Sequence, residues 1–430
     1  MNTRSLCFTL IASAFTLCGV PFAAIPLQAA DPAATAAEAV NSLGIDLLKK
    51  TAAPAGNALL SPYSIQTALA MTYAGASGVT RDEMARTLHF PKESAEVNDA
   101  FAALRKALED AEKNSAGMVA DSKRFGGPTE PVKLSIADRL FGQQGYDFRE
   151  AFLAVMKGSY DAPFEPLDFK KKADAARNHI NGWVADRTQQ RICDLIPPGA
   201  LTSDTRLVLV NAIYMKAPWA VHFDKESTRP GPFRIAGKEA ADVPTMFKKG
   251  PLGYAKRDGY AVVTLPYVGS ELQLLILLPD DADGLPALEA KLTPAMLAGD
   301  AQAEEIKALL YLPKFKLEPP TMALAEDLKA LGMKTAFDIP RGSANFDLIA
   351  PRKPDDYLCI SDVFHKAFLS LDENGTEAAA ATAVVMMRAM AMPAPEPKPV
   401  EIHVDHPFLF AIQHRQSGAC IFLGRVTDPR

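Results

Sequence analysis

This chain of 430 residues lacks a large excess of charge of either sign, because it has 46 lysines and arginines and 51 aspartates and glutamates. A nucleic-acid partner usually requires a basic surface, so the net charge of −5 argues against one. The sequence also lacks the motifs of common catalytic and phosphate-binding sites, namely G-x-S-x-G, H-E-x-x-H, the P-loop and G-x-G-x-x-G. We therefore expect no enzyme, no catalytic residue and no cofactor.

Cysteine is scarce, and the five cysteines include no C-x-x-C pair of the kind that binds metals or carries redox chemistry. Two of them, Cys7 and Cys18, lie in an apolar N-terminal segment. We interpret the other three as buried apolar thiols, and the sequence leaves open whether two of them form a disulfide. They are Cys193, Cys359 and Cys420.

The seven histidines are scattered along the chain. His403 and His406 are three residues apart, a spacing that places them on opposite faces of a strand. Together with His414 they could meet at a metal, but solvent-exposed histidines at a sheet edge are the favoured interpretation. We therefore expect no metal site.

No apolar run reaches the ~20 residues that a membrane-spanning helix requires. The uncharged apolar run from Leu6 to Val20 follows Arg4 and precedes an alanine-rich stretch that ends at Ala30. This order is typical of a secretory signal. The sequence therefore predicts a signal peptide over residues 1–30, a mature chain over 31–430, no membrane span, and export from a bacterium to the periplasm or the medium.

Helical and strand patterns are interleaved along the mature chain, without a repeat or a flexible linker, which predicts a single α+β domain. Ser61 and Pro62 mark a helix start, Thr80 to Glu83 resemble the capping box of the next helix, and a third helix is expected over 173–187. Strands are expected at 206–215, 261–266, 272–278, 308–317, 363–371, 407–413 and 419–426.

The segment from Leu371 to Met392 reads LDENGTEAAAATAVVMMRAMAM, in which acidic residues precede a run of small ones. Alanine content alone favours a helix. However, the segment follows an expected strand and precedes the proline-rich stretch 393–399, which is typical of an exposed, extended connection.

In these surroundings the segment resembles the reactive-centre hinge of the serpins, the serine protease inhibitor family. Further stretches across about 370 residues are similar to serpin signatures in the same order. They are 57–65, NALLSPYSI; 211–219, NAIYMKAPW; 265–267, LPY; 312–315, LPKF; 363–367, VFHKA; 406–410, HPFLF; and 422–426, FLGRV.

The resemblance implies the serpin fold, a single domain with a large central mixed β-sheet, two further sheets and about eight or nine helices. It also implies an exposed reactive-centre loop at about 373–399. A serine protease would cleave this loop and form an acyl-enzyme. The loop would then enter the central sheet as an added strand, and the protease would be trapped before hydrolysis finishes.

The resemblance assigns the hinge to nine residues: Glu373, Gly375, Thr376, Glu377, Ala378, Ala379, Ala380, Ala381 and Thr382. Strand alternation predicts that Thr376, Ala378, Ala380, Thr382 and Val384 enter the core, whereas Glu377 stays in water. Gly375 is expected to form a bend, because glycine tolerates positive φ.

The family spacing places the scissile bond between Ala389 and Met390, which suits an elastase-like or subtilisin-like protease. Arg388 is the rival bait residue and would favour a trypsin-like target, while Met387 is a further alternative. A cysteine protease also stays open as the target. The proline-rich stretch after this bond is longer than in many serpins. The sequence therefore leaves open which residue precedes the scissile bond.

The resemblance also assigns a hydrogen-bonded shutter beneath the opening strands to Ser61, Ser64, Asn211 and His365, and an aromatic at the top of the sheet to Trp219. Satisfied core packing would explain the same residue types. The sequence therefore predicts a monomeric secreted inhibitor. The alternatives are a noninhibitory serpin that acts as a binding or carrier protein and, more distantly, a hydrolase.

Overall fold

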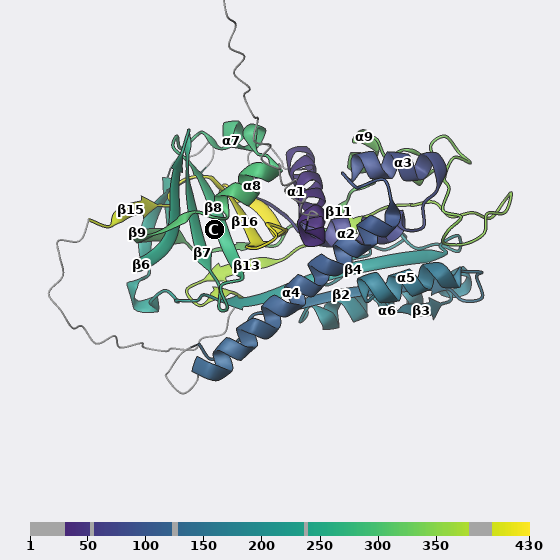
Figure 1. Cartoon of the computed structure of the whole chain (residues 1–430), viewed down its shortest axis with the longest axis horizontal. Coiled ribbons are helices and arrows are strands. Elements are labelled where there is room, and N and C mark those ends of the chain that lie inside the picture. Colours follow the sequence, from purple (N-terminus) through teal and green to yellow (C-terminus); the bar gives the residue numbers. More distant parts are fainter. Residues whose placement is uncertain (1–30, 52–55, 123–127, 236–239, 378–397) are drawn as a thin grey trace, which may run out of the picture. The chain divides into compact units, whose positions relative to one another are not determined.

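The computed structural model describes residues 31–51, 56–122, 128–235, 240–377 and 398–430. Within these residues helices and strands alternate in an α+β fold with three sheets, as the sequence predicts (Figure 1). The α-helices are α1 (Pro32–Thr51), α2 (Pro62–Tyr73), α3 (Gly78–Thr87), α4 (Ser94–Ser122), α5 (Glu150–Tyr160), α6 (Phe169–Arg187), α7 (Leu285–Lys291), α8 (Pro294–Asp300) and α9 (Ala325–Ala330).

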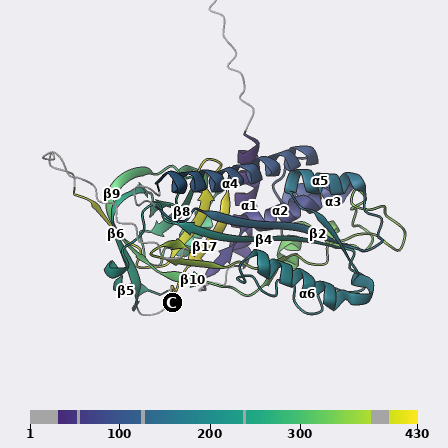
Figure 2. The same cartoon turned by 90° about the horizontal axis from the view of Figure 1, so that it is seen from below.

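A mixed six-stranded sheet has the strand order β10-β13-β14-β4-β2-β3. Its β2 and β3 run parallel, and its other neighbours are antiparallel. One face of β2 and β4 is covered by α6, and α2, α4 and α5 lie on the other side (Figure 2). The strands are β2 (Lys133–Gln143), β3 (Phe164–Leu167), β4 (Leu207–Pro218), β10 (Phe315–Leu317), β13 (Leu369–Asp372) and β14 (Gly375–Thr376).

A second sheet has the strand order β1-β17-β16-β8-β7-β6-β9-β15, with β5 paired to β6. Every residue of its apolar strand β8 is buried, as expected for a strand covered on both faces. The strands are β1 (Ala58–Leu60), β5 (Arg229–Arg234), β6 (Ala240–Arg257), β7 (Tyr260–Pro266), β8 (Leu272–Pro279), β9 (Glu304–Pro313), β15 (Val400–His403), β16 (Phe408–His414) and β17 (Cys420–Val426).

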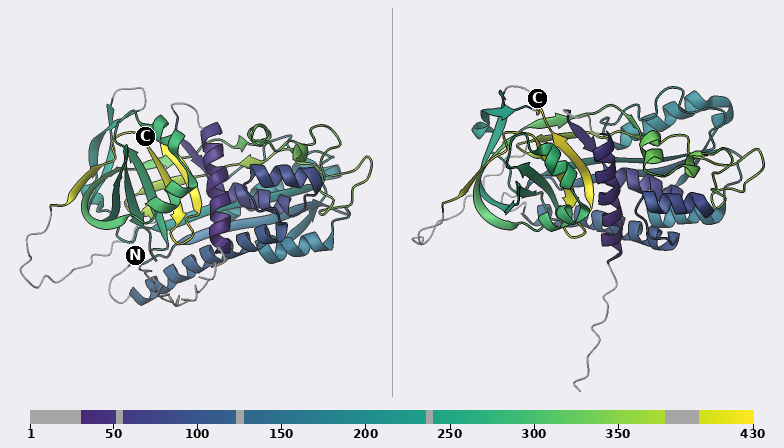
Figure 3. Two further views of the ribbon diagram at one scale, coloured as in Figure 1. Left: turned by 45° about the horizontal axis from the view of Figure 1, so that its top comes forward. Right: turned by 90° about the horizontal axis from the view of Figure 1, so that it is seen from above.

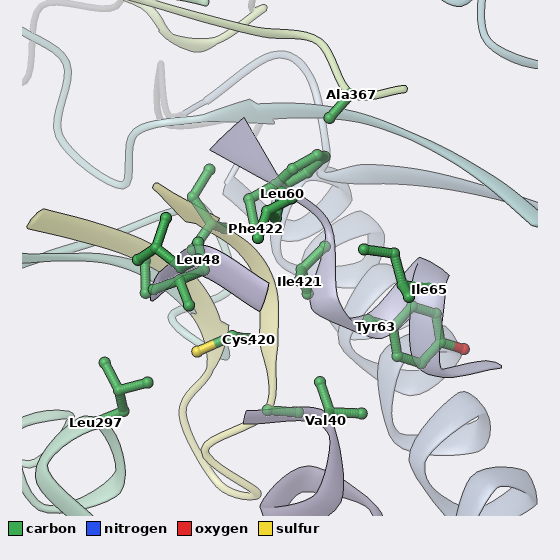
Figure 4. Packing of buried hydrophobic residues seen from close by; sticks show 14 of the residues in the cluster. Val40, Leu48, Leu60, Tyr63, Ile65, Leu297, Ala367, Cys420, Ile421 and Phe422 are labelled. Carbon is green, nitrogen blue, oxygen red and sulfur yellow. The ribbon is translucent and has the colours of Figure 1, made fainter. Parts of the chain in front are cut away.

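The core connects the two large sheets through α1 and α2. Helix α1 packs against α2, α4 and β17 (Figure 3). Leu60, Ile421 and Phe422 of β1 and β17 pack beside Tyr63 and Ile65 of α2 (Figure 4). Short elements complete the described fold: the two-stranded sheet of β11 (Met322–Ala323) and β12 (Phe364–His365), and the 3-10 turns η2 (Lys225–Ser227) and η3 (Thr335–Phe337).

Helix α2 begins as its sequence predicts, because Ser61 is the N-cap and Pro62 occupies the first turn. The capping box expected at Thr80 to Glu83 is wrong. Helix α3 already begins at Gly78, and the Glu83 carboxylate instead accepts hydrogen bonds from the backbone N–H groups of Lys334 and Thr335. A distant turn therefore uses the side chain that the local pattern assigned to a cap.

Two of the expected strands are interrupted. The stretch 308–317 divides into β9 and β10 at Lys314, whose N–H bonds to the Pro244 carbonyl. The stretch 363–371 divides into β12 and β13, which belong to different sheets. Both breaks occur where the chain passes from one set of tertiary partners to another, which no local pattern encodes.

The three cysteines of the described chain are all free thiols, and only Cys420 is buried. The expectation of buried thiols is therefore wrong for Cys359, which is exposed, and for Cys193, which is half-buried. Burial raises the pKa of the Cys420 thiol to about 12. Over the described ranges, no helix has the length and apolar character that a membrane crossing demands.

Candidate functional site

The short strand β14 lies inside the six-stranded sheet, between the C-terminal ends of β13 and β4. Gly375 pairs with Asp372 and Pro218, and Thr376 pairs with Leu371 and Ala217. Gly375 and Thr376 of the predicted hinge are therefore part of the sheet in this structure, as two residues of strand between two longer neighbours.

Gly375 occupies a position that no other residue type fits. Its φ is +146°, and a Cβ built on it would lie 2.1 Å from the Ala217 carbonyl oxygen. Both the backbone conformation and the close approach of β4 require glycine here. The bend expected from the sequence is present.

Thr376 faces the core between the two large sheets and is 1% exposed. Its hydroxyl shares a hydrogen bond of 2.6 Å with the Tyr267 hydroxyl, and burial raises the pKa of that phenol. The Tyr267 ring stacks on Trp219, with the ring centroids 4.7 Å apart. Thr376 thus reaches the aromatic pair that joins the end of β4 to the end of β7.

Trp219 anchors the hairpin formed by β13 and β14. Its indole N–H donates to the Asp372 carbonyl at 2.9 Å, and its backbone N–H donates to the Asn374 carbonyl at 2.9 Å. The aromatic that the resemblance placed at the top of the sheet therefore contacts the hinge directly.

Glu373 is a buried carboxylate with two polar partners. Its Oε2 lies 3.0 Å from the Lys314 ammonium, and its Oε1 accepts a hydrogen bond from the Thr228 hydroxyl at 2.8 Å. Burial alone would raise the pKa of Glu373, but a backbone hydrogen bond together with Lys314 and Thr228 lowers it below the ordinary value. The start of the hinge is thereby tied to β5 and to the β9–β10 junction.

Glu377 was expected to stay in water, and this expectation is wrong. Its side chain is only 7% exposed, and its Oε1 lies 2.6 Å from the Arg191 guanidinium. Alternation does place it on the face opposite Thr376, but the chain that follows α6 covers that face. Burial raises the pKa of Glu377, and Arg191 opposes the shift.

A second polar cluster joins α2 to the six-stranded sheet and to β12. The Ser61 N–H donates to His365 Nε2 at 3.1 Å, and the Ser61 hydroxyl donates to the Ile421 carbonyl at 2.7 Å. The Ser64 hydroxyl donates to the Asn211 carbonyl at 3.3 Å. The structure therefore brings the four shutter residues into one neighbourhood.

The protonation of His365 follows from its position. Burial lowers the pKa of this imidazole to about 4, and Nε2 must be unprotonated to accept the Ser61 N–H. His365 is therefore neutral at physiological pH.

Asp138 completes this cluster, and sequence reasoning missed it. Its Oδ1 accepts a hydrogen bond from the Asn211 amide, and the Asp138 side chain lines a cavity of about 110 Å³ between α4, β2 and α5. Burial raises the pKa of Asp138 to about 7, although Asn211 and Arg105 oppose the shift. An aspartate in register with Leu134, Ile136 and Leu140 was the available signal, because alternate residues share one face of a strand.

Beyond β14, strand β4 has one edge that is not paired with a described strand. From Leu207 to Lys216 its partner among the described strands is β2 alone. An edge of unpaired N–H and C=O groups is a template for an added strand. The arrangement can thus extend β14 along β4 without rearranging the β2–β4 ladder.

Several predicted site residues lie outside the described part of the chain. They are Ala378, Ala379, Ala380, Ala381, Thr382, Val384, Met387, Arg388, Ala389 and Met390. Within the described ranges, no group of three or more His, Cys, Asp or Glu side chains is arranged to hold a metal ion.

Comparison with known proteins places this geometry in context. The family model described as "Serpin (serine protease inhibitor)" matches residues 38–429. Leukocyte elastase inhibitor of Bos taurus is 39% identical over 385 residues, which cover 87% of this chain and 94% of that protein. Serpin B6 of Macaca fascicularis is 37% identical over 400 residues, 91% of this chain and 99% of that protein.

Solved structures agree with the sequence comparisons. A structure described as cleaved Serpin 42Da has a TM-score of 0.74 and 28% identity, and the match covers 93% of this chain and 100% of the other. Uncleaved ovalbumin also has a TM-score of 0.74, with 29% identity over 92% of this chain and all of the other.

Proposed function

The chain belongs to the serpin family of serine protease inhibitors, and we propose that it traps its protease by continuing β14 along the open edge of β4. The protease cleaves the loop that follows Glu377 and becomes acylated. The freed segment then adds to the six-stranded sheet as a strand between β4 and β13 and carries the protease with it. The protein acts once and is consumed.

The position of β14 is the observation that carries this proposal. Gly375 and Thr376 are already paired on both sides, to β13 and to β4. Each further residue that pairs adds a backbone hydrogen bond of about 1 kcal/mol net and buries its side chain on one face. The free energy gained along the strand is what drives insertion.

The residues after Glu377 fit such a strand. Thr376 fixes the register, so Ala378, Ala380, Thr382 and Val384 would follow it on the core face. All four side chains are small or β-branched. They would enter between packed neighbours with little steric cost, whereas a charged residue at these positions would be buried without a partner.

For the bait residue we propose Ala389, with the scissile bond between Ala389 and Met390. A small residue suits the shallow specificity pocket of an elastase-like or subtilisin-like protease. The similarity to proteins named leukocyte elastase inhibitor supports this choice. A shift of one residue would present Arg388 instead and select a trypsin-like protease.

Export by a signal peptide over residues 1–30 is proposed from the sequence pattern alone, as is the monomeric state. The bacterial source expected from that pattern has no support among the relatives compared, which come from Bos taurus and Macaca fascicularis. Mass spectrometry of the protein after expression in an exporting host tests the leader, because cleavage would leave Asp31 as the first residue.

The experiment that tests inhibition is incubation with elastase, subtilisin and trypsin, followed by denaturing gel electrophoresis. A covalent band at the summed mass of inhibitor and protease is expected with elastase or subtilisin. N-terminal sequencing of the released C-terminal fragment should begin at Met390. Loop cleavage with every protease of the panel and no covalent band would contradict the proposal and favour a carrier function.

A further inference from the structure

Strand β14 ends at Thr376, and the next residue, Glu377, has a backbone conformation that does not belong to a strand. Its φ is +50°, the left-handed region that a residue with a side chain rarely adopts. Its backbone N–H still donates to the Ser370 carbonyl at 2.9 Å, so the hydrogen bonding with β13 reaches this residue. For the next residue to join the strand, φ of Glu377 must change to a negative value, which swings its side chain.

The Glu377 side chain is held in place by Arg191. The Arg191 guanidinium lies 2.6 Å from Glu377 Oε1 and 5.1 Å from the centroid of the Phe368 ring beside β13. The carboxylate is almost fully covered, and Arg191 is half exposed. A charge-assisted contact between groups shielded in this way is stronger than an ordinary surface ion pair.

Arg191 itself is positioned by a turn rather than by a flexible loop. Its N–H donates to the carbonyl of Thr188, which is fully buried after the end of α6. The Thr188 hydroxyl accepts the Ile192 N–H at 3.1 Å. Two residues after Arg191, the Lys366 ammonium donates to the Cys193 carbonyl and ties the same segment to the chain before β13. The guanidinium is therefore presented to the hinge by fixed backbone.

We infer that Arg191 is a positioning residue for the inhibitory reaction: with Glu377 it forms a latch that holds the hinge at Thr376 until the loop is cleaved. The latch deepens the proposed function, since insertion past Thr376 requires Glu377 to leave this geometry. It stabilises the strained conformation of Glu377 and keeps β14 two residues long. Insertion of the cleaved loop then breaks the contact between Arg191 and Glu377.

Hydrogen–deuterium exchange of the intact protein tests the latch without any protease. The amides of 375–377 are followed in the wild type and in Arg191→Gln, Glu377→Gln and the double variant. Each single substitution should speed exchange about fivefold, the effect of losing one shielded ion pair. The double variant should be no faster than either single variant, because both remove the same interaction. Additive effects, or wild-type exchange in Arg191→Gln, would overturn the inference.

Arg187→Gln is the matched control. It removes the same charge from an exposed position on α6, where the guanidinium lies 5.9 Å from the centroid of the Trp183 ring. Exchange at 375–377 should stay at the wild-type rate, and an equal acceleration in this variant would also overturn the latch.

A second measurement separates the latch from the proposed function. The limiting rate of covalent-complex formation with saturating elastase should rise in Arg191→Gln but not in Arg187→Gln. If the wild type forms no covalent complex with any protease, the proposed function falls, while the exchange rates still decide whether the latch exists.

Discussion

Replacing Asp138 with asparagine should stabilise the protein at neutral and alkaline pH and leave it almost unchanged in acid. Burial raises the pKa of this carboxyl from 3.8 to about 7 in the folded protein. The unfolded chain therefore releases the proton near pH 4, whereas the folded protein keeps it until pH 7. Folding stability falls as the pH rises between these values, and the loss is complete above the folded pKa.

The magnitude follows from the size of the shift. About three pKa units at about 1.4 kcal/mol each give a cost of about 4 kcal/mol above pH 7. An asparagine can accept the same hydrogen bond from Asn211 without carrying the charge. For a folded unit of about 400 residues the unfolding entropy is about 0.8 kcal/mol/K, so the melting midpoint should rise by about 5 °C at pH 8.

His365 acts in the opposite direction over nearly the same range. Burial lowers its pKa from 6.5 to about 4, so the unfolded chain takes up the proton first and stability falls as the pH drops. The loss approaches about 3 kcal/mol at pH 4. The two groups largely offset one another in the wild type, and Asp138→Asn should expose the acid sensitivity caused by His365.

The assay is differential scanning fluorimetry at intervals from pH 4 to pH 8, with exposed Asp147→Asn as the matched control. The midpoint difference between Asp138→Asn and the wild type should grow from near zero at pH 4 to its full value at pH 8. A difference that is constant across this range would refute the reasoning that a buried, ionising carboxyl causes it.

Three further predictions concern the hinge and the bait residue. Thr376→Arg places a charge in a site that is 1% exposed, so the protein should be cleaved as a substrate without trapping the protease. The covalent complex seen on a gel should fall at least tenfold, because burying an unpaired charge costs several kcal/mol. Gly375→Ala introduces a Cβ at 2.1 Å from the Ala217 oxygen, and faster amide exchange of Thr376 should report that β14 leaves the sheet. Ala389→Arg should shift the preferred protease from elastase to trypsin, measured by second-order inhibition rates.

Sequence patterns predicted the fold well where a segment has one set of partners. The strand expected at 206–215, the apolar strand expected at 272–278 and the Ser61–Pro62 start of α2 all appear as expected, the first two as β4 and β8. Local patterns failed where a residue serves a distant segment. Glu83 caps the turn at Lys334, and Lys314 interrupts an expected strand by bonding to Pro244.

The candidate site divides in the same way. The bend at Gly375 could be inferred, because glycine tolerates positive φ, whereas the close approach of the Ala217 carbonyl could not. The surroundings of Glu377 could not be inferred, because they depend on Arg191, which lies far away in sequence and reaches the hinge only through the turn after α6. Asp138 left a detectable signal as a charge among apolar residues, but its partner Asn211 is set by the register of β2 and β4.

Insertion of the loop into the six-stranded sheet is the central claim, and the thermal stability of the cleaved protein tests it most directly. The protein would be cut once between residues 378 and 397, freed of protease, and compared with the intact protein by its melting midpoint. A marked rise in the midpoint after cleavage is predicted, because the released segment becomes a paired strand along β4. An unchanged or lower midpoint in the cleaved protein would contradict the account.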